Sequence, residues 1–276
     1  MAGTLRRVLV YPPVPAGPDV SWKAFGYLRP MDHDLAVREH AALREILRDA
    51  GVEVISGEID DAALQDGIFP YDPMITTDAG VILCRMGKPL REAEVDLAAR
   101  TLDDLGIPVI GRIAAPGMVE GGDTCWIDER TLAVGRGYRT NTEGILQLND
   151  LLAPRGVSVL GYDLPHWHGP SECLHLLSLI SMLDHNLAVV YLPLLPTAMV
   201  ELLNQRNIQL VPIPDEEFAS QGCNVLTLSP RRCVILKENV VTAERLRAAG
   251  CEVITYSGDE ISHNRTGGPT CLTRPL

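Results

Sequence analysis

The hydrophobic pattern of this chain repeats five times, each time as a helix-like stretch that ends at a glycine or asparagine and leads into a short apolar strand. The five junctions are Gly51-Val-Glu-Val-Ile, Gly106-Ile-Pro-Val-Ile, Gly156-Val-Ser-Val-Leu, Asn207-Ile-Gln-Leu-Val and Gly250-Cys-Glu-Val-Ile. Glycine and asparagine are the residues that close a helix in the left-handed backbone conformation. The spacings of 55, 50, 51 and 43 residues lie at or slightly above the period of propellers and solenoids.

Five such units predict a mixed α/β fold, a fivefold pseudosymmetric α/β propeller whose repeats surround a central active-site cavity. Apolar stripes at helical spacing, such as Val95, Ala98 and Leu102, indicate helices that pack on the outside of the strands. Because each repeat buries its apolar face against its neighbours, we predict a single domain over residues 1–276. In a ring of this kind, residues far apart in sequence can point into one cavity.

One segment breaks the repeat, since residues 11–33 are rich first in proline and then in aromatic residues. Pro12, Pro13 and Pro15 predict a long loop without regular structure. Loops of this length are usually either disordered or lids over a functional site. The aromatic side chains of Phe25 and Tyr27 favour a lid that covers an apolar surface, and a disordered loop is the alternative.

Composition and charge argue against several classes of protein. The 276 residues carry a formal net charge of −12, whereas nucleic-acid binding requires a clustered excess of lysine and arginine. No stretch reaches the roughly 18 uninterrupted apolar residues of a membrane span, and the start of the chain lacks the long apolar run of a signal peptide. We expect a cytoplasmic protein without a nucleic-acid or membrane partner, and a homo-oligomer is compatible with the sequence.

The seven cysteines are scattered and include no Cys-x-x-Cys pair, which fits a reducing compartment better than a disulfide framework. Most lie in apolar runs, where a cysteine is usually a small buried residue. Cys271 differs because it follows Gly267 and Gly268 in a turn, where packing does not require a thiol and backbone amides can approach a ligand. A nearby cation or hydrogen-bond donor would make this thiol a nucleophile.

A histidine and two acidic islands are candidate partners of this thiol. His175 stands in an otherwise apolar run, where a buried imidazole requires a partner or a function. The pattern is equally compatible with a hydrogen-bonded core histidine and with a catalytic one. Glu120 and Asp123 flank a Gly-Gly pair and are suited to binding a cation, and Asp66 and Asp72 form the second island. By themselves these residues indicate a thiol enzyme for a small cationic substrate.

Five motifs occur in a fixed order along the chain. They are Phe69-x-x-Asp-Pro, Glu120-Gly-Gly-Asp, Gly135-x-x-x-Arg-Thr-Asn, Leu174-His-Leu and Gly267-Gly-x-x-Cys-x-Thr-x-Pro. In this order the motifs resemble the guanidine-modifying family of arginine deiminases, amidinotransferases and dimethylarginine dimethylaminohydrolases. The resemblance covers the whole chain, most clearly from residue 66 onward. That family has a fivefold α/β propeller fold, which agrees with the repeat read from the residues.

The resemblance implies a role for each matching residue. Cys271 would attack the guanidinium carbon and form a covalent thiouronium-type intermediate, while His175 would protonate the leaving amine and then activate water. Glu120 and Asp72 would hold and polarise the guanidinium. Arg91 and Arg139 match the arginines that bind the α-carboxylate of the substrate. The full set of substrate-binding positions is Asp66, Phe69, Asp72, Arg91, Asp123, Arg139 and Ser178. No metal and no cofactor is expected.

The residue two positions after the histidine separates the branches of this family. Leu177 stands where deiminases and amidinotransferases place an aspartate, so the chain looks most similar to the dimethylarginine-hydrolysing branch. We predict a hydrolase of an N-substituted guanidine, most simply one that converts dimethylarginine to citrulline and dimethylamine. Tyr71 and Arg265 depart from that branch, which leaves another N-substituted guanidine open. An arginine deiminase or amidinotransferase is the alternative, and a non-catalytic binding protein on the same fold is the remoter one.

Overall fold

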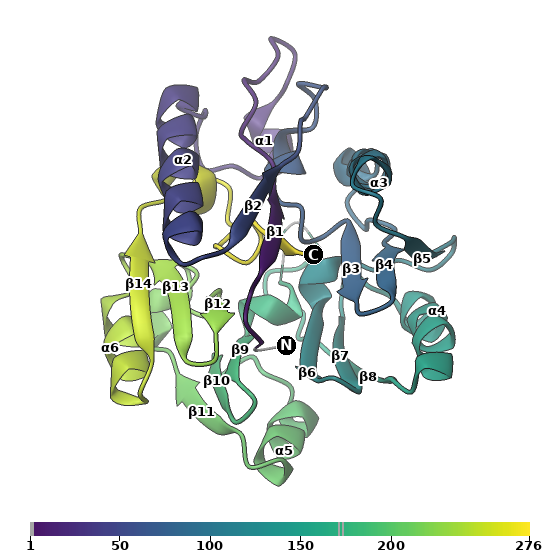
Figure 1. Cartoon of the computed structure of the whole chain (residues 1–276), viewed down its shortest axis with the longest axis vertical. Coiled ribbons are helices and arrows are strands. Elements are labelled where there is room, and N and C mark those ends of the chain that lie inside the picture. Colours follow the sequence, from purple (N-terminus) through teal and green to yellow (C-terminus); the bar gives the residue numbers. More distant parts are fainter. Residues whose placement is uncertain (1–2, 171, 173) are drawn as a thin grey trace.

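Five three-stranded sheets form the fold, one for each predicted repeat (Figure 1). The computed structural model describes residues 3–170, 172 and 174–276. The sheets are β15-β1-β2 (Arg274–Pro275, Arg7–Val10, Glu53–Ser56), β3-β4-β5 (Met74–Thr77, Gly80–Leu83, Val109–Arg112), β6-β7-β8 (Thr124–Asp128, Thr131–Arg136, Ser158–Asp163), β9-β10-β11 (Ile180–Asp184, Leu187–Val190, Gln209–Pro212) and β12-β13-β14 (Leu226–Ser229, Arg232–Leu236, Glu252–Tyr256).

In every sheet the middle strand pairs antiparallel with one neighbour and parallel with the other. A parallel partner requires a crossover connection, and a helix provides it in each repeat. These helices are α2 (His33–Asp49), α3 (Glu94–Asp104), α4 (Thr142–Leu152), α5 (Thr197–Gln205) and α6 (Val240–Ala248). They lie toward the outside of the molecule, around the five sheets (Figure 1).

Short helical turns join these elements. They are α1 (Trp22–Phe25), the 3₁₀ turns η1 (Gln65–Ile68), η2 (Pro89–Arg91), η3 (Gly121–Asp123), η4 (Ala153–Arg155), η5 (Leu176–Ser178) and η6 (Asp215–Glu217), and the π-helical turn η7 (Asp259–His263). Four of them, η1, η2, η3 and η5, contain or adjoin predicted site residues. The predicted site is therefore built largely at the turns between regular elements.

The five junction residues predicted from the sequence all adopt the left-handed conformation. Their φ angles are 83° at Gly51, 65° at Gly106, 76° at Gly156, 55° at Asn207 and 87° at Gly250. Glycine and asparagine tolerate this region because of their small or locally hydrogen-bonding side chains. Each junction ends its helical segment and turns the chain into the outer strand of the sheet. The backbone angles of these five residues therefore confirm the predicted repeat.

The middle strands form the centre of the hydrophobic core. β1, β4, β7, β10 and β13 consist mostly of buried apolar residues, because each has a sheet neighbour on both sides. The outer strands consist mainly of half-buried and exposed residues; they are β2, β5, β8, β11 and β14. The apolar face of each helix packs on the sheets, for example through Leu43 and Leu47 of α2 and Leu148 and Leu152 of α4.

The two ends of the chain share one sheet. β15 pairs antiparallel with β1, with Val8 opposite Pro275 and Leu9 opposite Arg274. The backbone N–H of Leu276 adds a hydrogen bond of 3.0 Å to the carbonyl of Arg7. The segment that carries the predicted nucleophile therefore runs directly into a strand of the first sheet.

The mixed α/β class and the five repeats are thus confirmed. The five sheets are separate from one another in their hydrogen bonding, so closure into a propeller stays a prediction, as does the single domain over residues 1–276. Among the described residues, no helix combines the length and the hydropathy needed to cross a membrane.

Candidate active site

His175 and Glu120 form a buried hydrogen-bonded pair. His175 Nε2 lies 2.8 Å from Glu120 Oε2, and the two residues are 7% and 0% exposed. Glu120 immediately precedes the turn η3 and His175 immediately precedes η5. These two turns pack on each other, so residues 55 positions apart meet at the ends of neighbouring elements.

Glu120 is surrounded by hydrogen-bond donors and positive charge. Its Oε1 accepts hydrogen bonds from the backbone N–H groups of Gly87 (2.9 Å) and Lys88 (3.2 Å). Nη1 of Arg139 donates to both carboxylate oxygens, at 3.2 and 3.3 Å. Burial alone would raise the pKa of Glu120, but the hydrogen bond and charge of His175, with the charge of Arg139, lower this pKa well below its usual range. Glu120 is therefore an anion at neutral pH.

A second carboxylate lies on the other side of the imidazole. Oδ1 of Asp72 is 3.8 Å from Nδ1 of His175 and accepts a hydrogen bond of 2.9 Å from the N–H of Gly122. Oδ2 of Asp72 accepts from Nη1 of Arg91 at 2.5 Å. The buried Arg91 side chain also forms an ion pair of 2.7 Å with Glu94. Arg91 thus orients Asp72, and its binding of a substrate carboxylate stays a prediction.

Cys271 lies close enough to Asp72 and His175 for both to act electrostatically on its thiol. Its Sγ accepts a hydrogen bond of 3.2 Å from Nδ2 of Asn224. Burial and the charge of Asp72 raise the pKa of the Cys271 thiol to about 11, although His175, the Asn224 hydrogen bond and a backbone N–H act in the opposite direction. The side chain is therefore a thiol at neutral pH until another positive charge approaches it. The structure brings together a thiol, an imidazole and two carboxylates.

Close packing explains the glycine pair that precedes the thiol. A Cβ atom on Gly267 would lie 2.5 Å from the ring of Phe69, and one on Gly268 would lie 2.4 Å from the side chain of Asn224. Asn224 Oδ1 in turn accepts a hydrogen bond of 3.0 Å from the N–H of Thr270. The two glycines therefore let this turn approach Phe69 and Asn224, and Asn224 bonds both the Thr270 backbone and the Cys271 sulfur.

Gly122 is equally constrained, because an added Cβ would lie 2.3 Å from Nδ1 of His175 and 2.7 Å from Oδ1 of Asp72. We predict that Gly122→Ala displaces both side chains and lowers kcat/KM by about 10²-fold, since misplacement of catalytic groups by about 1 Å has that effect. Steady-state kinetics measures the loss. Gly137→Ala is the matched control, because its Cβ would meet only Leu164 at 3.7 Å, and it should retain wild-type activity. Equal activity of both variants would contradict the proposed placement.

Both carboxylate oxygens of Asp123 accept hydrogen bonds from other groups of the protein. Its Oδ2 accepts a hydrogen bond of 2.7 Å from the Thr140 hydroxyl, and its Oδ1 accepts one of 3.1 Å from the N–H of Leu176. Burial raises the pKa of Asp123 from 3.8 to about 6, and the charge of Glu120 adds to this effect, while His175 and the hydrogen bonds oppose it. Asp123 ties η3 to η5, and its contact with substrate stays a prediction.

This raised pKa predicts how Asp123→Asn changes stability with pH. The folded protein keeps the Asp123 proton up to about pH 6 and the unfolded chain releases it near pH 3.8, so the folded state binds more protons in between. The free energy of unfolding therefore falls by up to about 3 kcal/mol as the pH rises through this window. Asp123→Asn should remove that fall. Urea unfolding at several pH values measures it, with the exposed Asp78→Asn as control, and parallel curves for Asp123→Asn and wild type would contradict it.

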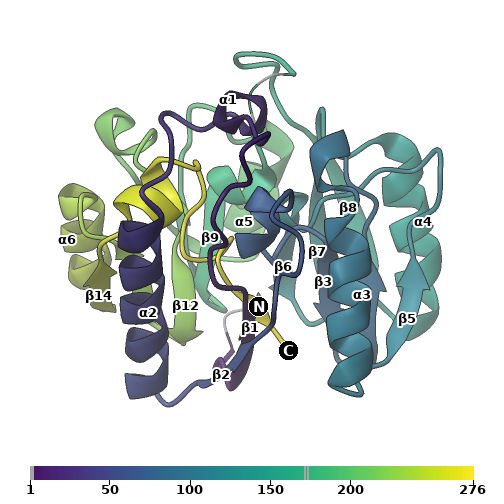
Figure 2. The same cartoon turned by 90° about the horizontal axis from the view of Figure 1, so that it is seen from above.

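Hydrogen bonds join the predicted lid segment, residues 11–33, to Asp66 and Lys88. The hydroxyl of Tyr27 donates to Asp66 Oδ1 at 2.8 Å, and Nζ of Lys88 donates at 2.8 Å both to Asp66 Oδ2 and to the carbonyl of Phe25. The segment contains the short helix α1, which the sequence did not predict, and Figure 2 shows it at one end of the molecule. Residues 11–33 thus cover part of the site, and their motion stays a prediction.

Every predicted site residue lies in or beside this cluster. Hydrogen bonds and ion pairs, some of them through Lys88, link Asp66, Asp72, Arg91, Glu120, Arg139 and His175. Asp123 and Cys271 are near enough to His175 to be affected by its charge. Phe69 packs on Gly267, and the N–H of Ser178 donates to the His175 carbonyl at 3.0 Å. The sequence did not single out Lys88 or Asn224. Asn224 is a polar residue inside an apolar run, and that interruption was the available signal.

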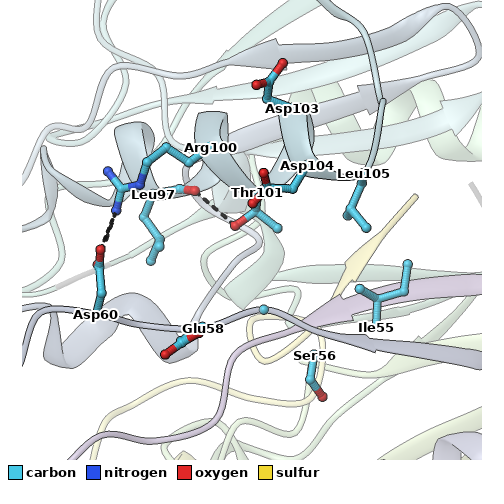
Figure 3. A pocket seen from close by; sticks show the side chains of 11 residues that line it. Ile55, Ser56, Glu58, Asp60, Leu97, Arg100, Thr101, Asp103, Asp104 and Leu105 are labelled. Atoms are coloured by element: carbon cyan, nitrogen blue, oxygen red, sulfur yellow. Dashed lines mark hydrogen bonds and ion pairs between the residues drawn. The ribbon is translucent and has the colours of Figure 1, made fainter.

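Asp72, Glu120 and His175 also offer ligand atoms within 4.8 Å of one another, the geometry of a metal site. Arg91 and Arg139 place a positive charge on each carboxylate, which opposes a divalent cation. A separate cavity of about 600 Å³ lies between β2 and α3 (Figure 3). Its lining includes Asp60, Asp103 and Asp104 and none of the predicted site residues.

The five-repeat fold, with a cysteine, a histidine and paired carboxylates gathered at its turns, defines a guanidine-modifying enzyme. More narrowly, the chain belongs to the family described as N,N dimethylarginine dimethylhydrolase, eukaryotic, whose sequence profile matches residues 23–276.

Two relatives and one solved structure are similar to this chain. The chain is 29% identical over 244 residues to an N(G),N(G)-dimethylarginine dimethylaminohydrolase of Streptomyces coelicolor, which covers 88% of this chain and 86% of that protein. It is 25% identical over 250 residues to an arginine deiminase of Listeria monocytogenes, covering 75% of this chain and 60% of the deiminase. The fold matches the dimethylarginine dimethylaminohydrolase of Pseudomonas aeruginosa, solved as a cysteine-to-serine variant with citrulline, with a TM-score of 0.82, 22% identity and coverage of 99% and 100%.

Proposed function

We propose that the protein is a cysteine-dependent hydrolase that cleaves a carbon–nitrogen bond of an N-substituted guanidine, most simply converting dimethylarginine to citrulline and dimethylamine. One observation carries the proposal: His175 lies between the carboxylates of Glu120 and Asp72, at 2.8 and 3.8 Å, and acts electrostatically on the Cys271 thiol. Membership of the dimethylarginine dimethylhydrolase family supports the substrate class.

The two carboxylates bind the substrate cation. A guanidinium is a poor electrophile because its charge is spread over three nitrogens. Glu120 is anionic and buried, and Asp72 lies across the imidazole from it. Hydrogen bonds from the guanidinium to these oxygens localise the positive charge and open the carbon to attack. The same positive charge offsets the effect of Asp72 on Cys271 and so lowers the pKa of the thiol.

The first half of the reaction releases the amine. The Cys271 proton passes to His175, and the thiolate attacks the guanidinium carbon to form a tetrahedral adduct. His175 then donates the proton to the substituted nitrogen, whose bond to carbon breaks as dimethylamine leaves. Cys271 remains bound to carbon as an alkylthiouronium. No oxidation or reduction takes place, and the proposed steps use no metal and no cofactor.

The second half restores the enzyme. His175, now without its extra proton, removes a proton from water while the water oxygen attacks the thiouronium carbon. The carbon–sulfur bond breaks while the hydroxyl proton of the adduct passes to sulfur, so citrulline forms as the ureido product and the thiol is regenerated. His175 then releases to solvent the proton that it took from water. The Asn224 hydrogen bond to Sγ stabilises the leaving thiolate. The acidic pair that held the cation binds the neutral product less strongly, which favours its release.

Leu177 supports hydrolysis of a substituted guanidine over deimination of arginine. Its side chain is buried and packs in the apolar cluster with Leu176, Leu179 and Ile180, where an aspartate would meet an unsubstituted nitrogen. An apolar contact accepts a methylated nitrogen and leaves a bare N–H without a partner. Amidino transfer and a binding-only role are the alternatives, and retention of Cys271, His175 and Glu120 together argues against the latter.

Several further features belong to the same proposal. We infer a closed fivefold ring within one domain, because the five sheets and their outer helices are arranged around the middle of the molecule (Figure 1). We also propose that the enzyme is cytoplasmic. Residues 11–33 would open to admit the substrate, because Glu120, Asp72 and His175 are all at least 93% buried. A small-molecule guanidine is the only partner that this chemistry requires, and a homo-oligomer is compatible with it.

A panel of guanidines tests the function. We expect ureido product and free amine from mono- and dimethylarginine, and little turnover of arginine or agmatine. Colorimetric detection of the ureido group and chromatographic detection of the amine measure the two products separately. Turnover of arginine as fast as dimethylarginine would favour a deiminase, and transfer of the amidino group to an added amine would favour an amidinotransferase. No product from any guanidine, with a folded protein, would overturn the proposal.

A further inference from the structure

A buried arginine near the predicted site has no carboxylate partner. Arg265 is 4% exposed, and among the described residues no aspartate or glutamate forms an ion pair with it. Its Nη1 donates to the hydroxyl of Tyr27 at 3.1 Å and to the carbonyl of Gln65, and its Nη2 contacts the sulfur of Met31. The Nε–H is buried and has no hydrogen-bond partner in the part of the chain that the structure describes. The Tyr27 ring also packs against the guanidinium, with 4.9 Å between Arg265 Cζ and the ring centroid, but a buried cation with an unbonded N–H and no carboxylate partner is costly unless an anion binds it.

The acidic side chain that shares the Tyr27 hydroxyl with Arg265 is already neutralised. Asp66 accepts 2.8 Å hydrogen bonds from Lys88 and from Tyr27, and Nε of Arg91 lies 4.0 Å from the same carboxylate. Tyr27 is neutral, because burial and the charge of Asp66 raise its pKa far above the physiological range. Asp66, Lys88 and Arg265 together, which we call the distal cluster, therefore carry one positive charge in excess.

The distal cluster lies at a defined distance from the proposed guanidinium site. The backbone N–H of Lys88 donates to Glu120 at 3.2 Å, while its Nζ donates to Asp66 at 2.8 Å. One lysine residue thus spans the gap between the two acidic groups. The bonds from the backbone nitrogen to Nζ of lysine are as many as those from the guanidinium carbon of arginine to its α-amino nitrogen. Asp66 and the Lys88 ammonium are consequently placed where the far end of an arginine-like substrate would lie, and the Tyr27 hydroxyl joins Arg265 to Asp66.

We propose that the distal cluster selects an N-substituted guanidino acid whose carboxylate binds Arg265, in place of the predicted Arg91 and Arg139, and whose amino group is absent or acylated. Arg91 and Arg139 already form ion pairs with Asp72, Glu94 and Glu120. This inference rests on the proposed function, since it assumes that the guanidinium binds at Glu120. A carboxylate would neutralise the excess charge and accept the unpartnered Nε–H in a bidentate arrangement. A free ammonium would instead face Lys88 and find Asp66 already paired.

Three ligands with the same dimethylguanidine end test the proposal. They are dimethylarginine, its des-amino analogue, which keeps the carboxylate, and its decarboxylated des-amino analogue, which has neither group. We expect kcat/KM for the des-amino acid to exceed that for dimethylarginine by at least about tenfold, and the compound without a carboxylate to be a poor substrate. A tenfold preference for dimethylarginine would overturn the inference and leave the proposed function standing.

Variants assign the preference to the cluster. Arg265→Gln should raise KM for the des-amino acid by at least about tenfold with little change in kcat, and Lys88→Met should shift the preference toward dimethylarginine, because it frees Asp66. Lys23→Met removes an exposed lysine of residues 11–33 whose Nζ lies over the Trp22 ring, and it should change neither the KM nor the preference. Arg265→Lys keeps the charge without the planar fork, and thermal melting verifies that each variant folds. Unchanged selectivity in folded Arg265 and Lys88 variants would overturn the inference.

Ligand affinity, measured without turnover, tests this inference independently of the proposed function. In Cys271→Ser, calorimetric titration measures affinity for the same three ligands without turnover. Tighter binding of the des-amino acid than of dimethylarginine supports the distal cluster as the selective element, even if none of the three is hydrolysed by the wild-type enzyme. Equal binding of all three ligands would overturn it.

Discussion

Replacement of Cys271 by serine should lower turnover of dimethylarginine by about 10⁴-fold or more. The serine hydroxyl occupies nearly the same position and can keep the Asn224 hydrogen bond, but it ionises far less readily than a thiol. The carboxylates of Glu120 and Asp72 are unchanged, so the variant should still bind substrate. Initial rates and calorimetry on the same preparation measure the two properties, and mass spectrometry of the wild-type enzyme, quenched during turnover, should detect the adduct on Cys271.

A second cysteine provides the control for this prediction. Cys251 is also buried, but it immediately precedes β14 and packs in the cluster with Ile235 and Leu246, which contains none of the predicted site residues. Cys251→Ser should retain wild-type turnover apart from a modest loss of stability. If Cys271→Ser kept more than a tenth of the wild-type rate, the covalent mechanism would be wrong.

Replacement of His175 by asparagine should lower kcat by about 10²–10⁴-fold, the contribution of a positioned general acid and base. Dimethylamine is a strong base and leaves only after it is protonated. The fold should persist, because Glu120 keeps its hydrogen bonds from Gly87, Lys88 and Arg139. Circular dichroism checks the fold while steady-state kinetics measures the loss.

A substrate with a different leaving group distinguishes a general acid–base role of His175 from a structural role. S-Methylthiocitrulline expels methanethiol, which departs without a general acid, so the first half-reaction of His175→Asn should be largely spared. The second half still requires a base, and the covalent intermediate on Cys271 should therefore accumulate and be visible by mass spectrometry. Equal losses with amine and thiol leaving groups would contradict the assignment. His185→Asn is the control, since the His185 side chain is 84% exposed and bonded to Asp184.

Much of the fold could be predicted because its repeat depends on properties of neighbouring residues. The five left-handed residues that end the helical segments are glycine or asparagine, and the strands that follow are short and apolar. A closing residue and a hydrophobic run are properties of a few neighbouring residues, so they are visible without knowledge of the tertiary structure. Closure of the ring depends on contacts between repeats, and no local pattern encodes it.

The candidate site was predictable where chemistry restricts the residue type and unpredictable where geometry decides. Cys271, His175 and Glu120 stand out because a thiol, an imidazole and a carboxylate interrupt turns or apolar runs. Lys88 and Asn224 are ordinary polar residues whose partners, Asp66 and Cys271, lie 22 and 47 positions away. Such pairs exist only once separate repeats have packed together, so their importance is visible only in three dimensions.

The pairing of β15 with β1 has a consequence for the order of assembly during synthesis. The first sheet has its third strand only when residues 274 and 275 reach residues 8 and 9, which are the most widely separated partners in the chain. During synthesis, four sheets can therefore form before the first one is complete. Reactivity of the Cys271 sulfur should appear only after residues 274 and 275 have left the ribosomal exit tunnel and paired with β1.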